Sequence, residues 1–114
     1  MKQVEGACLS FYVAENRRHR GMLVYEWLLQ QAVGLGLSGG SAFRAIAGFG
    51  RHHRLHEQHF FELAGDVPIE VTFVVDAEEE VRLLDVVERA GLSLVFVRQP
   101  VTHGVINGTP DASK

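Results

Sequence analysis

The chain has 114 residues, which is enough for one domain with its own core and too few for two. Hydrophobic residues make up 46% and charged residues 22%, and the net charge of -3 argues against a general nucleic-acid-binding surface. No apolar run approaches the roughly 18 residues of a membrane span, and no export signal is visible at the N-terminus. We therefore expect a cytoplasmic protein that neither enters a membrane nor binds nucleic acid, with its one cysteine, Cys8, reduced.

The first half of the chain predicts a strand, a helix and a second strand. Residues 6–14 alternate in the manner of a strand, and residues 15–21 read as a polar, basic loop. Residues 22–35 carry apolar side chains at spacings of three and four, which indicates a helix. That stripe consists of Val24, Leu28, Ala32 and Leu35. Gly36 can end the helix, and residues 41–49 predict the next strand.

The second half predicts two strands, a helix and a last strand. Residues 55–63 and 69–75 have strand character, the latter with clear alternation. Asp76 with Glu79 three positions later is a capping-box arrangement for a helix that ends at Gly91. The expected apolar stripe of this helix is Val81, Leu84, Val86 and Val87.

The last strand is expected at residues 92–98, and residues 99–114 are expected to be a partly flexible tail. The strand-helix-strand order occurs twice within residues 6–98 and predicts an α+β, ferredoxin-like β-α-β-β-α-β sandwich, an antiparallel sheet with two helices on one face. Residues 1–114 then form a single domain with 6–98 as its core.

Two of the expected strands, 41–49 and 92–98, are apolar on both faces. If helices cover one face of the sheet, the other face is an exposed apolar patch. A second layer supplied by other copies of the chain would cover it, so we expect a homo-oligomer.

Four histidines lie within eight positions: His52, His53, His56 and His59. Imidazole suits zinc, copper and nickel, so one interpretation is a divalent-metal site. In a strand, however, His56 and His59 point to opposite faces and do not share one ion. The other interpretation is a solvated loop with pH-responsive charge.

The same region offers an anion cradle. Gly48 and Gly50 allow a ligand to approach the backbone, and Arg51 and Arg54 supply charge. The pattern matches no standard phosphate-binding loop, and the alternative interpretation is that the glycines are hinges.

Other arginines stand out by position. Arg44 is a charge in an apolar strand, and a buried arginine needs a carboxylate or ligand partner. The candidate carboxylates are Glu26, Glu62 and Glu70. Arg98, at the end of the last strand, is likewise a charge in an apolar strand that needs a carboxylate or ligand partner. The basic cluster of Arg17, Arg18, His19 and Arg20 is either a solvated loop or an anion contact.

No nucleophile, base and orienting group can be assembled from the sequence, so no catalytic residue is predicted and we do not expect an enzyme.

Three segments carry a family resemblance: Val24-Tyr25-Glu26, the run Arg44-Ala45-Ile46-Ala47-Gly48-Phe49-Gly50, and Arg54-Leu55-His56. With them the chain resembles, over roughly residues 7–98, the uncharacterised PII-like bacterial proteins, which are related in fold to the nitrogen-regulatory PII signal transducers. The resemblance implies a ferredoxin-like homotrimer whose loop 48–59 reaches a partner protein, either a membrane transporter or an enzyme.

The resemblance also implies that a small anionic effector, with an adenine nucleotide as the first candidate, binds between subunits near the base of that loop. The candidate ligand-binding residues are Arg44, Gly48, Phe49, Gly50, Arg51, His56 and Arg98. The alternative function is a divalent-metal-binding trimer that uses the histidine cluster.

Overall fold

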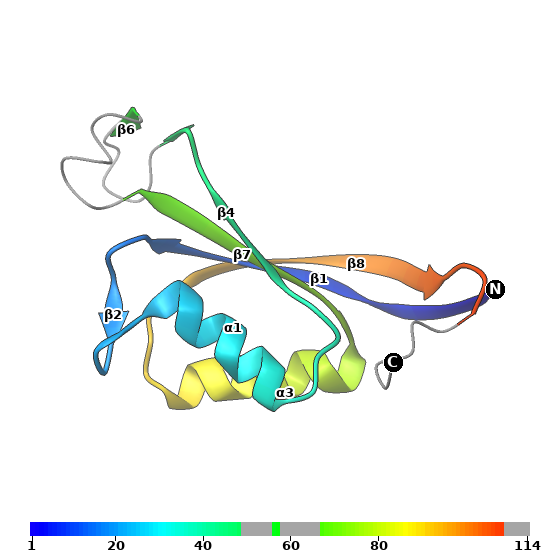
Figure 1. Ribbon diagram of the computed structural model, residues 1–114. Coiled ribbons are helices and arrows are strands. Elements are labelled where there is room, and N and C mark those ends of the chain that lie inside the picture. The colour runs from blue at the N-terminus through cyan, green and yellow to red at the C-terminus, as the bar shows by residue number, and fades with distance from the viewer. Residues whose placement is uncertain (49–55, 58–66, 109–114) are drawn as a thin grey trace.

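The computed structural model describes residues 1–48, 56–57 and 67–108. They form one four-stranded antiparallel sheet with two helices on one face (Figure 1). The strands of this sheet are β1 (Lys2–Ala14), β4 (Ser41–Arg44), β7 (Pro68–Asp76) and β8 (Val95–Val105). The helices are α1 (Val24–Gly34) and α3 (Ala77–Arg89). The strand order β4-β7-β1-β8 confirms the expected ferredoxin-like arrangement.

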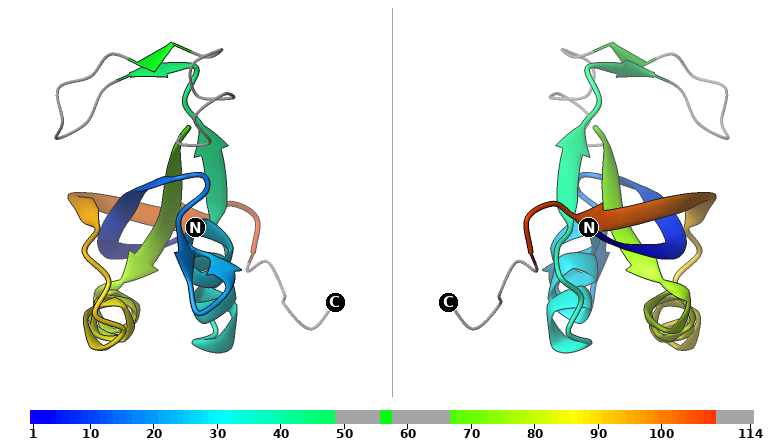
Figure 2. Two further views of the ribbon diagram at one scale, coloured as in Figure 1. Left: turned by 90° about the vertical axis from the view of Figure 1, so that its left-hand side faces the viewer. Right: turned by 90° about the vertical axis from the view of Figure 1, so that its right-hand side faces the viewer.

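Two short ribbons complete the described structure. β2 (Arg18–His19) pairs with β3 (Met22–Leu23), and β5 (Ala47–Gly48) pairs with β6 (His56–Glu57). Both ribbons lie at the end of the molecule away from the N-terminus, β2–β3 on the helix side of the sheet and β5–β6 on the opposite side (Figures 1 and 2). No helix in the described part of the chain is long and apolar enough to cross a membrane.

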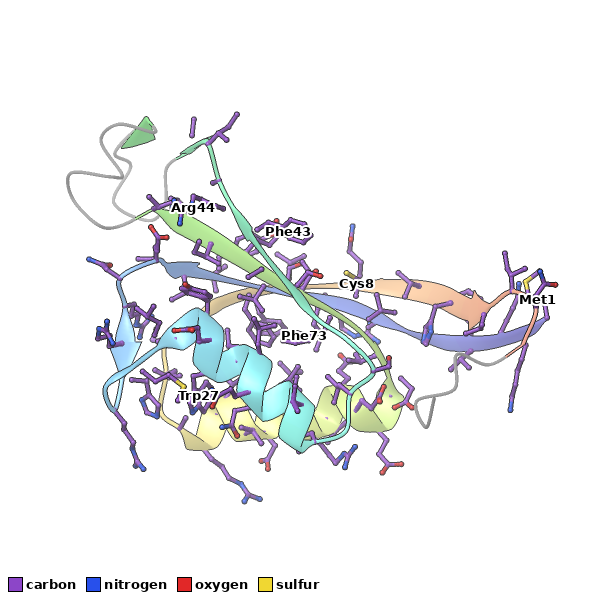
Figure 3. The ribbon with its side chains drawn as sticks, viewed as in Figure 1. Met1, Cys8, Trp27, Phe43, Arg44 and Phe73 are labelled. Atoms are coloured by element: carbon purple, nitrogen blue, oxygen red, sulfur yellow. The ribbon has the colours of Figure 1, made fainter. Side chains whose placement is uncertain are left out.

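The core lies between the sheet and the helices, because alternate residues of β1 and β7 face the helices. The buried strand residues are Ala7, Leu9, Phe11, Val13, Ile69, Val71, Phe73 and Val75. The buried helix residues are Val24, Leu28, Ala32, Leu83 and Val87. Figure 3 shows Phe73 pointing from the sheet toward the helices. The stripe expected on α1 is confirmed, whereas on α3 Val81 is exposed and Leu83 takes the core position.

The three expected helix-end signals are confirmed, and Gly91 after α3 adopts a φ of 72°. The backbone N–H of Glu79 donates to the Asp76 carboxylate at 2.8 Å, and the Asp76 N–H donates to the Glu79 carboxylate at 2.9 Å. After α1, Gly36 adopts a φ of 82°. Its N–H donates to the Val33 carbonyl and the Leu37 N–H donates to that of Ala32, both at 3.0 Å, which is a Schellman ending.

Several boundaries differ from the expectation. The first strand begins at Lys2 and not at residue 6, and the first two residues of the expected helix 22–35 form β3. The expected strand 41–49 is divided into β4 and β5. The expected loop 15–21 contains β2. Of the expected strand 55–63, the structure describes only β6, and the rest lies outside the described residues.

The largest correction concerns the last strand. β8 runs from Val95 to Val105, so residues 99–105 are strand and not tail. They pair with β1 as far as Lys2 opposite Val105, and this two-stranded arm extends past the helices (Figure 1). β8 is an edge strand, where a proline such as Pro100 is tolerated.

The face of the sheet opposite the helices carries exposed apolar side chains, as expected. We call it the open face; its exposed apolar residues are Tyr12, Phe43, Val74, Val95 and Val97. Figure 3 shows Phe43 and Cys8 on this side, opposite Phe73. The sheet therefore has two apolar faces, of which this chain covers one.

Candidate functional site

The expected loop 48–59 begins in a short backbone pairing. β5 and β6 pair there, with Gly48 opposite His56. Below them the Ala45 N–H donates to the Pro68 carbonyl at 2.9 Å. This hydrogen bond continues the β4–β7 pairing, in which Arg44 lies opposite Ile69. The chain thus leaves and re-enters the sheet at one point, the loop base.

Arg44 lies at this loop base, at the end of β4 (Figure 3). Its side chain is 57% exposed, and its guanidinium forms an ion pair with the Glu15 carboxylate. The expectation of a buried arginine was therefore wrong, and the carboxylate that it contacts is neither Glu26 nor Glu70; Glu62 lies outside the described residues. Arg44 ends an edge strand, where it reaches the segment that follows β1 and not the interior of the sheet.

Glu15 contacts both sides of the loop base. Its carboxylate pairs with Arg44 before the loop, and its backbone N–H donates to the Val67 carbonyl after the loop at 2.6 Å. Because the Glu15 carboxylate already pairs with Arg44, any anion that binds Arg44 must compete with Glu15 or share the guanidinium.

A hollow of about 160 Å³ lies beside Arg44 and is lined by residues of β1, β4 and β7. Its lining residues are Tyr12, Phe43, Arg44, Ala45, Pro68, Ile69 and Glu70. The two aromatic rings and one guanidinium suit a planar group that carries negative charge nearby. The hollow is smaller than a typical ligand pocket, which occupies about 300–1,000 Å³.

Arg98 is not at the loop base of its own chain. It lies inside β8 rather than at the end of the last strand, and β8 and β4 form opposite edges of the sheet. Its Nε donates to the Glu80 carboxylate of α3 at 2.5 Å. This hydrogen bond and the attraction of the negatively charged Glu80 carboxylate raise the pKa of Arg98 above its usual value. Arg44 and Arg98 can line one site only where two subunits meet.

Three predicted ligand-binding residues, Phe49, Gly50 and Arg51, lie outside the described residues. The same holds for His52, His53 and His59, while His56 is placed only through its backbone pairing in β6. Among the residues that the structure describes, no three His, Cys, Asp or Glu side chains gather as metal ligands would.

Glu15, Tyr12 and Phe43 were not predicted from the sequence as members of the site. Glu15 is the acidic residue at the start of a basic loop, and only the tertiary structure reveals its partner. Tyr12 and Phe43 have the alternation of ordinary strand residues, although Phe43 is 56% exposed. The available signal for a binding site was that two aromatic residues lie on the face that the helices do not cover.

Comparison with known proteins shows the family. Residues 6–103 match the model of DUF190, described as "Uncharacterized ACR, COG1993". The chain belongs to the DUF190 family. A UPF0166 protein from Aquifex aeolicus (strain VF5) is 32% identical over 82 residues, which cover 72% of this chain and 77% of that protein.

Solved structures confirm the predicted PII-like fold of this DUF190 chain. CPII from Thiomonas intermedia K12, a nitrogen regulatory PII-like protein solved with ADP, AMP and bicarbonate, is 21% identical, with 91% of this chain and 92% of that chain covered and a TM-score of 0.64. A PII-like protein from Thermus thermophilus is 15% identical, with 90% and 92% covered and a TM-score of 0.59. At these identities the likeness shows the fold alone.

Proposed function

We propose that the protein is a cytoplasmic, non-enzymatic regulator of the PII-like type, a homotrimer that binds a small anionic effector at the loop base. The observation that carries this proposal is the exposed Arg44 beside a hollow lined by Tyr12 and Phe43. An adenine nucleotide has the two parts that this arrangement suits, a flat base and negatively charged phosphates. CPII, which has the same fold, was solved with ADP and AMP.

The small size of the hollow supports a site between subunits. A volume of about 160 Å³ does not enclose a nucleotide, so a neighbouring subunit has to complete the pocket. The open face supplies a reason for subunits to associate, because its exposed apolar residues gain free energy when another copy covers them. In such an assembly Arg98, which pairs with Glu80 on the helix side of the sheet, would have to leave Glu80 and reach the loop base of another subunit past the edge strand β8.

In the proposed mechanism the effector binds one arrangement of the loop base more tightly than another, and loop 48–59 then contacts a partner, a membrane transporter or an enzyme. The residues proposed for the effector are those expected from the sequence, with Tyr12 and Phe43 added. No chemical step is involved. Conversion of ATP or ADP by the purified protein would contradict the regulator assignment.

The test is a thermal-shift screen of the purified protein against ATP, ADP, AMP and bicarbonate. We expect one adenine nucleotide to raise Tm, as binding to the folded state requires. Arg44→Gln should remove the shift. Arg89→Gln should keep it, because Arg89 is an exposed arginine of α3 that pairs only with Asp85 among the described residues. An absence of any shift across the nucleotide panel would count against the proposal.

The metal-binding alternative is tested in the same screen with zinc and copper. It predicts stoichiometric uptake that is lost on replacing His52 and His56 with alanine. Uptake without any nucleotide response would favour the alternative over the regulator.

A further inference from the structure

The segment 17–23 forms a basic hairpin, made of β2, a two-residue turn and β3. Contacts within the hairpin and with the rest of the chain hold it in place. The Arg17 guanidinium donates to the Ser93 carbonyl at 2.6 Å, and that of Arg18 donates to the Gly21 carbonyl at 2.8 Å. The His19 ring packs edge-on against Trp27 with ring centroids 5.2 Å apart. The hairpin is therefore a fixed projection and not merely a solvated loop.

Arg20 occupies the tip of the basic hairpin in an unfavourable conformation. With His19 paired to Met22, the turn residues are Arg20 at a φ of 52° and Gly21 at a φ of 84°. Two positive φ values in a two-residue turn are typical of type I′, where the first position prefers Asn, Asp or Gly. In this left-handed backbone conformation the Cβ of an L-residue lies too close to the following carbonyl oxygen, and arginine lacks the short polar side chain that lets Asn and Asp adopt it. Backbone strain of this kind is frequent at functional positions.

The charge of Arg20 is not used by the described part of its own chain. The side chain is exposed, and no described residue accepts a hydrogen bond from it. The nearest acidic residue along the chain, Glu15, is already paired with Arg44. Glu26, in the first turn of α1, is the next carboxylate and is also exposed. The tip thus presents positive charge to the solvent.

The hairpin contrasts with the rest of the molecule. Arg17, Arg18 and Arg20 are three of eleven basic residues, and without them the net charge would be -6 instead of -3. A large polyanion such as nucleic acid or an anionic membrane would meet this negative remainder as well as the hairpin. A narrow acidic segment would meet the hairpin alone. All three cations are arginines, and the planar guanidinium of Arg20, which donates to no described residue, is the one open to a carboxylate through two parallel hydrogen bonds.

We propose that the basic hairpin is a docking surface for an acidic segment of a partner protein. It lies at the end of the molecule that also carries β5 and β6, on the helix side of the sheet whereas β5 and β6 lie on the other side (Figures 1 and 2), so one partner that contacts both the loop base and the hairpin has to span this end. The inference does not depend on the nucleotide site, and either proposal stands if the other fails.

The test measures binding of a fluorescein-labelled hexaglutamate peptide to the full chain by anisotropy at two salt concentrations. Arg20→Asn removes the charge and retains a residue that the turn accepts, so Tm should be equal to that of the wild type or higher. Its affinity for the peptide should fall about threefold, as loss of one exposed charge pair implies. Arg89→Asn, which removes the same charge from α3, should leave the affinity unchanged.

Two results would overturn the proposal. One is equal affinity of the wild type and Arg20→Asn, or an equal loss in Arg89→Asn, since the peptide would then respond only to net charge. The other is a preference of the wild type for phosphatidylserine vesicles or single-stranded DNA over the peptide, with the same Arg20 dependence, since the partner would then be a membrane or a nucleic acid.

Discussion

The Glu15 carboxylate pairs with the Arg44 guanidinium across the loop base, while the backbone of Glu15 holds the other side of the same loop at Val67. Glu15, whose carboxylate pairs with the arginine proposed to bind the effector, therefore also joins the two sides of the loop base. An effector that draws Arg44 away from Glu15 changes the contacts of this junction, which gives binding a physical route to the loop.

Replacing Glu15 with Gln should strengthen binding of the effector. The substitution removes the competing carboxylate and leaves Arg44 free, and an exposed ion pair of this kind contributes up to about 1 kcal/mol, or about fivefold in affinity. Titration calorimetry with the adenine nucleotide that gives the largest thermal shift measures the change.

The matched control is Glu26→Gln, which removes an equal charge from the exposed first turn of α1. It should not reproduce the gain. An unchanged or lower affinity for Glu15→Gln, in a variant with the wild-type circular dichroism spectrum, would show that Glu15 and the effector do not compete for Arg44.

The open face predicts the effect of a charge on assembly. A lysine at Val97 would have to be buried in any contact made by this face, at a cost of several kcal/mol per interface. We expect light scattering to give three times 12.6 kDa, about 38 kDa, for the wild type, and 12.6 kDa for Val97→Lys. The control is Val33→Lys, because Val33 is an exposed apolar residue of α1 on the other side of the molecule. A trimer that survives Val97→Lys would place the subunit contact elsewhere.

The capping box of α3 should contribute measurably to stability. Asp76→Ala leaves the Glu79 N–H without its acceptor and should lower the free energy of unfolding by about 1 kcal/mol. Glu78→Ala is the control, since Glu78 lies in the same turn but takes no part in the box. Urea titrations of both variants at one protein concentration make the comparison. Equal losses in the two variants would mean that charge near the helix end, and not the cap, is responsible.

The turn before β4 offers a matched pair of glycines. A Cβ at Gly40 would lie 2.5 Å from a ring carbon of the buried Phe73, whereas a Cβ at Gly39 would meet nothing within 4 Å. Gly40→Ala should therefore destabilise the fold by about 1–3 kcal/mol, as overpacking does. Gly39→Ala should be neutral or slightly stabilising. Thermal unfolding distinguishes them, and a Gly40→Ala protein with the wild-type Tm would show that Phe73 can move aside at little cost.

Local signals made much of this fold predictable. Asp76 with Glu79, the Val24 stripe and Gly36 each act within one or two helical turns, so the sequence indicates both helices and their ends. The strand alternation of β1 and β7 is equally local. Together with the repeated strand-helix-strand order, these patterns were sufficient for the ferredoxin-like arrangement.

Individual contacts between residues far apart in the sequence could not be predicted. The partner of Arg44 depends on how the end of β1 meets the end of β4, and no spacing rule selects Glu15 over other acidic residues. The extension of β8 was hidden because Pro100 and Gly104 are typical of a tail, although an edge strand accepts both. The turn of the basic hairpin was hidden because arginine is unusual at the position that Arg20 occupies.

The pairing of β1 with β8 also has a consequence for the order in which the protein is made. β1 lies between β7 and β8 in the sheet, but the segment that covers its β8 edge leaves the ribosome only after β7 and α3 have been made. Until then the nascent chain presents an uncovered central strand, which is able to pair with strands of other chains. Contacts so distant in sequence also slow folding. We therefore expect β8 to be the segment whose truncation during synthesis most readily causes aggregation.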